Sequence, residues 1–445
     1  MITEKETALV KEALDIACSK GADKARATLF KSMENMVATL NGEIDRVTLC
    51  ADTSLSMALF VDGRFGSFST NKLDRKSLEE FIEKSIGIVR MLGVDRYRDL
   101  PSPDRCCKTA VTGNELDLVD SDYDRITPQQ RLDTAKAASA FPFKSDRGFE
   151  VISEEAEYSD SIYDTVVMDT NGLCCRHSET CFDYGVEVTI EDTDGEKYSG
   201  YWWDSSSKHD SLKSGECCRK AIERAAANIG AQAVESGRYN MVIDSETASK
   251  VVSPVLRALS AYSIQQSNSF LKDSKDKKVF PEGMSIMDMP HIPGQTCSKL
   301  FDSEGVATKE TPIIENGVVK QYFVNTYMAN KLQVPATIED ATRPKVMPWP
   351  TKGLSRDDIM SMCGSGILVT DFNGGNSNSA TGDFSYGVEG FWFENGKIVK
   401  PVSEMVVTGN FLTLWNNLIA AGDDSRSCMS KLIPTLAFSN VDFNG

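Results

Sequence analysis

The sequence predicts an α+β protein of two domains. Helical and strand patterns occur in separate blocks and do not alternate as βαβ units. Strand patterns joined by short Asn-Gly or Asp-Gly turns indicate antiparallel sheets. A chain of 445 residues is long enough for more than one hydrophobic core. We expect an N-terminal mixed helix and antiparallel-sheet domain, residues 1–237, and a β-rich C-terminal domain, residues 238–445.

The first ninety residues predict the order α-β-β-β-β-α. Apolar residues recur at helical spacing over residues 4–20, and Gly21 favours the end of that helix. Residues 24–50 alternate as strands, and Asp62-Gly63 marks a hairpin in the next apolar run. A second helix is expected over residues 73–92 with Asp74 as its N-cap, because an Asp side chain satisfies a free helical N–H group.

Residues 94–125 are polar and contain prolines, which predicts an excursion over the surface. Thr127-Pro128 then begins a helix that is expected to run to about residue 140. Residues 149–203 form a predicted meander of long strands with turns at Asn-Gly and Asp-Gly pairs. A long helix over residues 212–234 is predicted to end the first domain at Gly237.

The second domain begins with a predicted strand at residues 239–243 and a helix over 246–262 capped by Ser245. The remaining residues to 445 are mostly predicted β structure, with short helices near residues 356–363 and 412–420.

The most distinctive stretch is residues 380–410, where small residues precede an aromatic strand, Phe391-Trp392-Phe393. Asn395-Gly396 then predicts a tight hairpin turn, because both central residues of a type I′ turn need positive φ. Dense glycines beside a strand predict that another backbone approaches closely.

Composition excludes several functions. The formal charge is −17, from 48 basic and 65 acidic residues, so the surface repels phosphate backbones and direct nucleic-acid binding is disfavoured. No apolar run approaches the roughly 20 residues that span a bilayer. The first residues have a charged, helical pattern that is not that of a signal peptide. Twelve cysteines without a C-x-x-C pair predict reduced thiols. We therefore expect a cytoplasmic protein with no membrane partner.

Short segments of the second half occur in a specific order. They are residues 301–306 (FDSEGV), 314–318 (IENGV), 382–385 (GDFS), 390–396 (GFWFENG), 401–402 (PV) and 408–410 (TGN). In this order they resemble the TldD/PmbA family, also called modulators of DNA gyrase. The first half is similar to the family more loosely. The resemblance implies a two-domain TldD/PmbA-like fold over essentially the whole chain.

The resemblance also implies two branches. The TldD branch has an H-E-x-x-x-H motif on a helix and a late cysteine, and binds zinc as a peptidase. Two histidines one helical turn apart can share a metal, and the glutamate can take a proton from metal-bound water. The PmbA branch, also called TldE, lacks the motif and pairs with the metal-bearing subunit.

This chain resembles the PmbA branch. Its three histidines, His177, His209 and His291, are far apart in sequence, so no helix presents the motif. The corresponding helix, residues 253–266, contains neither histidine nor glutamate. We therefore expect no metal or other cofactor on this chain and zinc on a TldD-like partner. Cys428 lies near the position of the late cysteine and is interpreted as an ordinary thiol.

Two other groups of side chains bear on catalysis. Asp302 and Glu304 suggest a carboxylate pair for acid–base chemistry, but a hydrogen-bonded turn is the favoured interpretation. Asp383 and Ser385 have no histidine neighbour, so a serine nucleophile lacks a visible base. No catalytic residue is assigned. The residues expected to contact substrate or a partner subunit are Asp302, Glu304, Gly305, Gly382, Asp383, Ser385, Gly387, Gly390 and Trp392.

The sequence therefore predicts a PmbA/TldE-like subunit, itself without a metal, of a TldD/TldE-type zinc metallopeptidase. It would help to bind and process small unfolded peptides, with the strand at 382–396 offering an edge to the peptide. Two alternatives remain open: an independent peptidase or hydrolase with an altered site, and a non-enzymatic modulator of DNA gyrase that acts by protein contact. The family further implies a dimer, formed with a TldD-like subunit or with a second copy.

Overall fold

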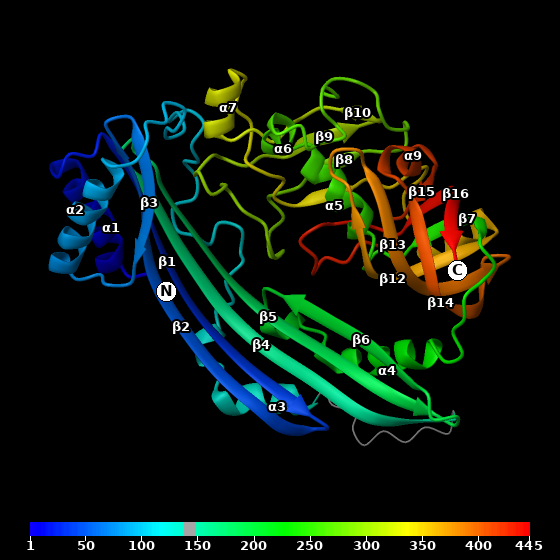
Figure 1. Ribbon diagram of the computed structural model, residues 1–445. Coiled ribbons are helices and arrows are strands. Elements are labelled where there is room, and N and C mark those ends of the chain that lie inside the picture. The colour runs from blue at the N-terminus through cyan, green and yellow to red at the C-terminus, as the bar shows by residue number, and fades with distance from the viewer. Residues whose placement is uncertain (138–147) are drawn as a thin grey trace.

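The computed structural model describes residues 1–137 and 148–445 of the chain. Three sheets organise these residues: a long six-stranded sheet in the N-terminal half, a small four-stranded sheet, and a second six-stranded sheet in the C-terminal half. Figure 1 shows the long sheet as a curved blade that extends beside the more compact C-terminal half.

The described part of the N-terminal half contains the long sheet and the helices that cover it. Its elements are α1 (Glu4–Ser19), β1 (Lys24–Leu40), β2 (Glu43–Val61), β3 (Arg64–Thr70), α2 (Arg75–Val89), η1 (Tyr123–Arg125), α3 (Pro128–Ala137), β4 (Phe149–Asp169), β5 (Cys174–Asp192), β6 (Lys197–Ser206), η2 (His209–Ser211), η3 (Ser214–Glu216) and α4 (Cys217–Ala227).

The C-terminal half is richer in short strands. Its elements are β7 (Gly237–Ile243), α5 (Ser249–Ala258), α6 (Ala261–Gln265), β8 (Ile286–Asp288), β9 (Thr311–Glu315), β10 (Val318–Val319), α7 (Thr326–Leu332), β11 (Pro344–Val346), α8 (Arg356–Cys363), β12 (Ser365–Ser377), β13 (Asp383–Glu394), β14 (Lys397–Asn410), α9 (Phe411–Asn416), β15 (Leu418–Ala421) and β16 (Leu436–Asn444).

The long sheet is antiparallel throughout, in the order β3-β2-β1-β4-β5-β6. Successive side chains of a strand point to opposite faces, so each strand supplies both faces. Helices α1 and α2 cover one end of one face, and α3 and α4 cover the other end of the same face. We call this the helix-covered face and its reverse the open face.

The C-terminal sheet closes on itself. Its order is β14-β13-β12-β7-β16-β15, and β14 also pairs with β16 through residues 406–408 and 442–444. Strands β7, β12, β13, β14 and β16 therefore form a closed barrel. Helix α5 packs against its core through Val251, Val252 and Val255, and the indole N–H of buried Trp415 donates to the Val251 carbonyl at 3.3 Å. Each of these five strands therefore pairs with a neighbour on both sides.

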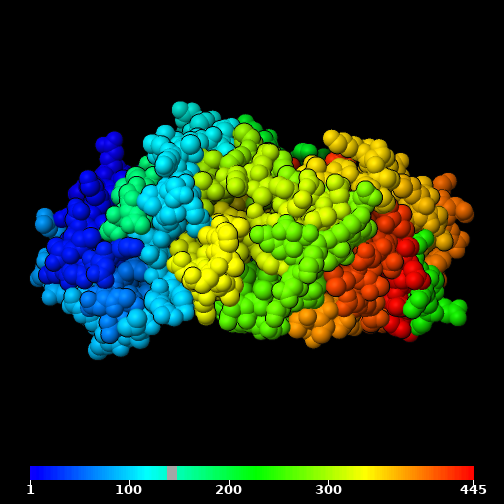
Figure 2. All heavy atoms as spheres, turned by 90° about the horizontal axis from the view of Figure 1, so that it is seen from above, coloured from blue at the N-terminus to red at the C-terminus, as the bar shows by residue number. Residues whose placement is uncertain are grey.

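The two halves meet on the open face. The Cys297 N–H donates to the Glu179 carboxylate at 3.1 Å, and Arg426 donates to the Trp203 carbonyl. Residues 94–125 also lie in this contact between the halves, which we call the joint, and Cys106 pairs there with Val306. Figure 2 shows this cyan segment directly against the yellow part of the C-terminal half. The prediction of a surface excursion was therefore incomplete, because the segment also buries side chains between the halves.

Several local predictions are confirmed. The α+β class is correct. Asp74 caps α2 by accepting the Ser77 N–H at 3.0 Å. Asp62-Gly63 and Asn395-Gly396 both have positive φ at each residue, as type I′ turns require. The twelve cysteines all lie in the described ranges and are free thiols.

Other predictions were wrong in extent. The first ninety residues contain three strands, because β1 runs unbroken for 17 residues. The helix expected over 212–234 is only α4, since the chain turns at Gly230 with positive φ. The helix expected over 246–262 divides into α5 and α6, and Ser245 does not cap it. Residues 418–421 form β15 in place of the end of a helix.

The end predicted for α3, residues 138–140, lies outside the described residues. Among the helices of the described chain, none combines the length and apolarity needed to cross a bilayer. The proposed boundary at residue 237 stays a prediction, although the long sheet ends before it and β7 begins there.

Candidate functional site

The glycine-rich hairpin lies inside the C-terminal barrel. Strand β13 pairs with β12 on one side and with β14 on the other over nearly its whole length. Both of its edges are occupied, so the expectation that residues 382–396 offer a free edge to a peptide was wrong. The strand cannot accept an added strand without losing one of its own neighbours.

The glycines of β13 allow the backbone of the neighbouring strand β12 to approach closely. A Cβ on Gly390 would lie 1.8 Å from the Leu368 carbonyl oxygen, and a Cβ on Gly387 would lie 2.2 Å from that of Asn373. Both neighbours belong to β12, and register shifts interrupt this pairing nearby. The close backbone approach that the glycines predict is therefore real, and the approaching backbone is the adjacent strand.

Asp383 and Ser385 line an open cavity of about 640 Å³ at the start of β13. Its remaining walls are Asn268, Phe384 and residues 376–379. The Asp383 carboxylate accepts hydrogen bonds from the Thr381 hydroxyl at 2.6 Å and the Asn410 amide at 2.9 Å. These bonds, that from Asn410 first, lower the pKa of Asp383. Asp383 is thus a fixed anion, and its partners supply no base for Ser385.

Gly382 and Trp392 have structural contacts. Gly382 has φ of +84°, and a Cβ there would lie 3.1 Å from the Phe270 ring. The Trp392 ring packs edge-on against Tyr239 with centroids 5.2 Å apart, and its N–H donates to Glu394 at 2.9 Å. Trp392 therefore lies at the opposite end of β13 from the cavity.

Asp302 and Glu304 form a turn, as the favoured interpretation expected. One Asp302 oxygen accepts the N–H groups of Glu304 and Val306, each at 2.9 Å. Burial raises the Asp302 pKa from 3.8 to about 6, although its backbone hydrogen bonds oppose this rise. The Glu304 carboxylate instead accepts the N–H and hydroxyl of Thr326 at the start of α7.

Gly305 belongs to the joint between the halves. Its φ is +80°, and a Cβ there would lie 2.3 Å from the Leu173 side chain at the β4–β5 turn. Its carbonyl accepts the Cys107 N–H at 2.9 Å. The residues expected around 302–305 and 382–392 therefore divide between a joint and a barrel, and do not form one site.

The segment that corresponds to the metal-binding helix forms α5 and α6. Among its exposed side chains are Arg257 and Tyr262, and neither is a zinc ligand of the histidine type. Within residues 1–137 and 148–445, the side chains do not bring three His, Cys, Asp or Glu residues into a metal-binding arrangement. The donor set of this segment does not fit zinc.

Cys428 and the histidines have separate environments. Burial raises the pKa of the Cys428 thiol, which lies beside Arg426 and Asp204. His177 packs edge-on against Phe301, with centroids 6.4 Å apart, while His291 is hydrogen-bonded to Thr308 at 2.8 Å. The third histidine, His209, contacts Asp210.

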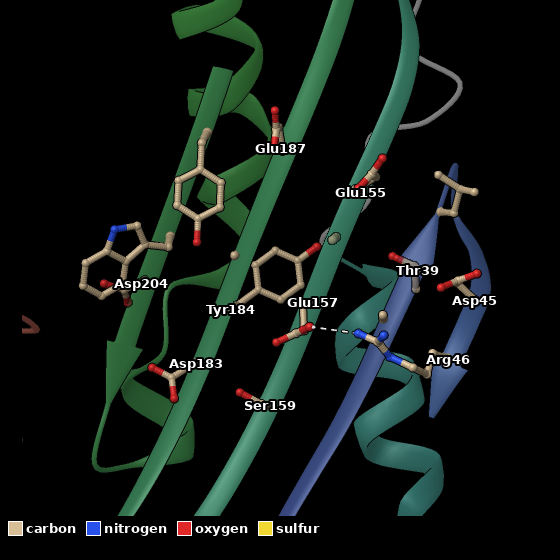
Figure 3. Close-up of a pocket in the computed structure, with 16 residues that line it drawn as sticks. Thr39, Asp45, Arg46, Glu155, Glu157, Ser159, Asp183, Tyr184, Glu187 and Asp204 are labelled. Atoms are coloured by element: carbon tan, nitrogen blue, oxygen red, sulfur yellow. Dashed lines mark ion pairs between the residues drawn. The ribbon is translucent and has the colours of Figure 1, made fainter. Parts of the chain in front are cut away.

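A groove on the open face of the long sheet was not predicted. It has a volume of about 660 Å³ and crosses five strands, from β2 to β6 (Figure 3). One row of paired residues runs across it: Arg46, Ala38, Glu157, Gly185 and Trp203. The Tyr201 hydroxyl lies over Gly185, where a Cβ would come within 2.6 Å of it. Glycine therefore makes room for an aromatic side chain at the wall.

The groove is strongly acidic. Its lining contains six carboxylates, Asp45, Glu155, Glu157, Asp183, Glu187 and Asp204. Arg46 is the one basic residue among the sixteen described residues that line it, and it lies 3.7 Å from Glu157. Both members of that pair are at least half exposed, so their attraction is weak. The arrangement favours a cationic, partly apolar ligand.

A sequence signal for the groove exists but is faint. Glu155 and Glu157 alternate with buried residues in β4, and Asp183 and Glu187 do so in β5. Alternation places each pair on one face. That the two pairs share a face with Tyr201 depends on strand register, which the sequence does not reveal.

Fold and sequence together define the class of protein. Residues 121–229 match the model of the PmbA/TldA metallopeptidase central domain, and residues 236–445 match the model of its C-terminal domain. The class is thus metallopeptidase-like. The chain belongs to the PmbA/TldD family.

Individual relatives in the same family match this chain over nearly its whole length. The metalloprotease PmbA of Escherichia coli O157:H7 is 27% identical over 451 residues, which cover 96% of this chain and 94% of the relative. A PmbA homolog from Haemophilus influenzae is 28% identical over 93% of this chain and 90% of its own length.

Among solved structures, a proposed modulator of DNA gyrase from Bacteroides thetaiotaomicron VPI-5482 is 37% identical, with full coverage of both chains and a TM-score of 0.95. TldE from Thermococcus kodakarensis is 16% identical, covers 98% of this chain and 100% of its own, and has a TM-score of 0.84; it supports the fold alone.

Proposed function

We propose that this chain is the peptide-holding, metal-free subunit of a TldD/TldE-type metallopeptidase. It binds small unfolded peptides in the groove on the open face and presents them to a TldD-like partner, which supplies the zinc. The acidic groove is the observation on which this proposal rests. Family membership and the relatives named PmbA support it.

The dimensions of the groove suit a short extended segment. Five neighbouring strands span about 19 Å, since strands lie roughly 4.8 Å apart. An extended peptide rises about 3.3 Å per residue, so about six residues fit across the sheet. Tyr201 is half exposed and offers an apolar surface beside the carboxylates. Lys and Arg side chains combine an apolar stem with a cationic head, and match both features.

The division of labour follows from the residues of α5 and α6. They contain no histidine pair, so this chain would contribute binding and its partner the metal-dependent cleavage. The partner, the zinc and the peptide are parts of the proposal.

The partner is tested by reconstitution. This chain is purified alone, mixed with the TldD-like subunit of the same organism, and assayed for peptide cleavage with the metal content of each subunit measured. We expect co-purification, zinc on the partner only, and higher cleavage by the mixture than by either subunit. Stoichiometric zinc on this chain, together with cleavage that a chelator abolishes, supports an independent hydrolase instead.

The groove is tested separately by fluorescence anisotropy with a labelled, unstructured, lysine-rich peptide. The double variant Glu157→Gln and Glu187→Gln should weaken binding about tenfold, because two rim charges contribute roughly 0.7 kcal/mol each in high dielectric. The matched control is Glu80→Gln on α2, an exposed residue away from the groove, which should leave binding unchanged. Equal affinity for an acidic peptide contradicts the charge argument.

The alternative of a gyrase modulator has no feature of the described residues in its favour beyond the description of similar proteins. This alternative is tested directly by measuring binding of the purified chain to gyrase at physiological salt. Such binding would not require the groove.

A further inference from the structure

Two pairs of adjacent cysteines meet in the joint. Cys106 and Cys107 belong to the segment 94–125. Cys174 and Cys175 are the first residues of β5. Cys106, Cys107 and Cys175 pack together in one small buried cluster. Cys107 is 4% exposed and Cys175 is 1% exposed, and neither lines the groove or the cavity at the start of β13.

Cys107 and Cys175 are in contact, although they lie far apart in the sequence. The Cys175 Sγ lies 3.2 Å from the Cys107 carbonyl oxygen, and the two thiols are close enough to share a hydrogen bond. Backbone hydrogen bonds position both residues. The Arg176 N–H donates to the Ala110 carbonyl at 2.9 Å, and the Cys107 N–H donates to the Gly305 carbonyl at 2.9 Å. The fold therefore holds these two sulfur atoms together.

The other pairings among these thiols are unfavourable. Cα atoms of adjacent residues lie about 3.8 Å apart, which is shorter than the roughly 4.4–6.8 Å that an unstrained disulfide spans. Successive residues of a strand also point to opposite faces, so Cys174 is exposed where Cys175 is buried. The Cys106 thiol donates to the Ser102 carbonyl at 3.6 Å. Among the described residues, these thiols do not form part of a metal-binding group of three.

We propose that Cys107 and Cys175 are a site of reversible oxidation, at which hydrogen peroxide forms a disulfide that fastens the joint. The Cys107 thiolate attacks one peroxide oxygen and the O–O bond breaks, which leaves a sulfenic acid on Cys107 and releases hydroxide. The Cys175 sulfur then attacks the Cys107 sulfur, and the S–O bond breaks as the oxygen leaves as water. The hydroxide takes up the remaining thiol proton, so one peroxide is reduced to two water molecules while two thiols are oxidised to one disulfide.

The surroundings identify Cys107 as the attacking thiol. Hydrogen bonds from Cys175 and from the Thr109 hydroxyl, 3.5 Å away, lower the pKa of Cys107 to about 5, although burial opposes this change. The contact with Cys107 raises the pKa of Cys175. The thiolate is the reactive form, and a second thiol beside it converts the sulfenic acid to a disulfide before further oxidation. Because both residues are nearly buried, the oxidant must be small.

The bond would change how the joint is held. In the reduced chain, hydrogen bonds and apolar contacts connect the segment 94–125 to β5. The C-terminal half packs against the same segment, where Cys106 pairs with Val306. The disulfide would fix this segment covalently to the long sheet, and with it the surface on which the C-terminal half rests. The inference does not depend on the proposed function, because neither thiol lines the groove.

Peptide mapping tests the bond in the native chain. The folded chain is treated with hydrogen peroxide, its remaining thiols are alkylated in denaturant, and the tryptic peptides are analysed by mass spectrometry with and without dithiothreitol. We expect the peptide of residues 106–108 to be joined to the peptide that ends at Arg176, and the two to separate on reduction. Maleimide applied to the reduced, folded chain should label the exposed thiols first. Bridges confined to exposed thiols, or the absence of this peptide pair, overturn the proposal.

Single substitutions assign the sulfur atoms, because trypsin leaves each pair of adjacent cysteines in one peptide. Cys107→Ser and Cys175→Ser should each abolish the cross-link. Cys106→Ser and Cys174→Ser are the matched controls, one residue away, and should retain it. Circular dichroism shows that each variant is folded, and the mapping of the native chain stands without them. A cross-link that persists in Cys107→Ser or in Cys175→Ser overturns the assignment.

Thermal unfolding measures whether the bond fastens the fold. It would close a loop of about 70 residues, so the oxidised native chain should have a Tm at least about 5 °C above that of the reduced chain. Cys107→Ser, treated with peroxide in the same way, controls for oxidation of the other thiols and should show no such rise. An equal Tm for the reduced chain and for native chain in which mapping has shown the bond overturns the claim that the disulfide fastens the joint.

Discussion

Replacing Gly390 by alanine should destabilise the C-terminal barrel severely. The added Cβ would lie 1.8 Å from the Leu368 carbonyl oxygen, whereas real Cβ atoms do not approach other atoms within 3.0 Å. Strands β12 and β13 must therefore separate by more than 1 Å where Gly390 pairs with Val369, beside the register shift between Val369 and Asp371. The clashing atom is backbone, so no side-chain rotation relieves it.

The magnitude follows from two losses. Separation breaks about two ladder hydrogen bonds in a buried position, at roughly 1–3 kcal/mol each. Overpacking adds about 1–3 kcal/mol. We expect the free energy of unfolding to fall by about 4 kcal/mol, and Tm to fall by about 8–16 °C for a cooperative unit of roughly 200 residues.

The assay is urea and thermal unfolding followed by circular dichroism, with Gly87→Ala as the control. Gly87 lies in α2, and apart from its chain neighbours and the adjoining helix backbone no atom lies within 4 Å of the position that an alanine methyl group would take, so alanine should raise stability by up to about 1 kcal/mol. A Gly390→Ala loss below about 1 kcal/mol would refute the claim that the β12 backbone is what these glycines accommodate.

Two further predictions concern charge. Because burial raises the Asp302 pKa from 3.8 to about 6, its carboxyl stabilises the fold at low pH, and this contribution of about 3 kcal/mol is lost as pH rises from 4 to 7. Urea unfolding across that pH range should show the stability of Asp302→Asn rising relative to that of the native chain. Parallel plots of stability against pH for the two proteins would contradict this prediction. Arg131→Ala should cost about 3–5 kcal/mol in urea unfolding, because it leaves the fully buried Asp160 carboxylate, 2.6 Å from Arg131 Nε, without its cation; Arg125→Ala, an exposed pair, should cost under about 1 kcal/mol.

Local signals in the sequence predicted local structure well. The turns at Asp62-Gly63 and Asn395-Gly396 depend on two adjacent residues that tolerate positive φ, and the cap at Asp74 depends on one side chain. The predicted end of the helix over 212–234 was wrong, because the alanine-rich pattern continues past Gly230. The backbone of Gly230 already has positive φ and is not helical.

The site was harder to predict because it depends on register. Arg46, Glu157 and Trp203 share one row only because four strand pairings align them, and their separations exceed 40 residues. The glycines of residues 382–396 correctly predicted a close backbone, but nothing local distinguishes a neighbouring strand from a bound peptide.

Closure of the barrel has a consequence for synthesis on the ribosome. Strand β7 ends at Ile243 and needs β12 on one side and β16 on the other, and β16 begins only at Leu436. At about 5–20 residues per second, β7 waits roughly 10–40 s for its last neighbour to emerge. The long N-terminal sheet, complete by Ser206, is already available during that delay. Nascent chains should therefore pass through a stage in which a finished N-terminal sheet is tethered to an open, aggregation-prone half-barrel that ribosome-associated chaperones would need to shield.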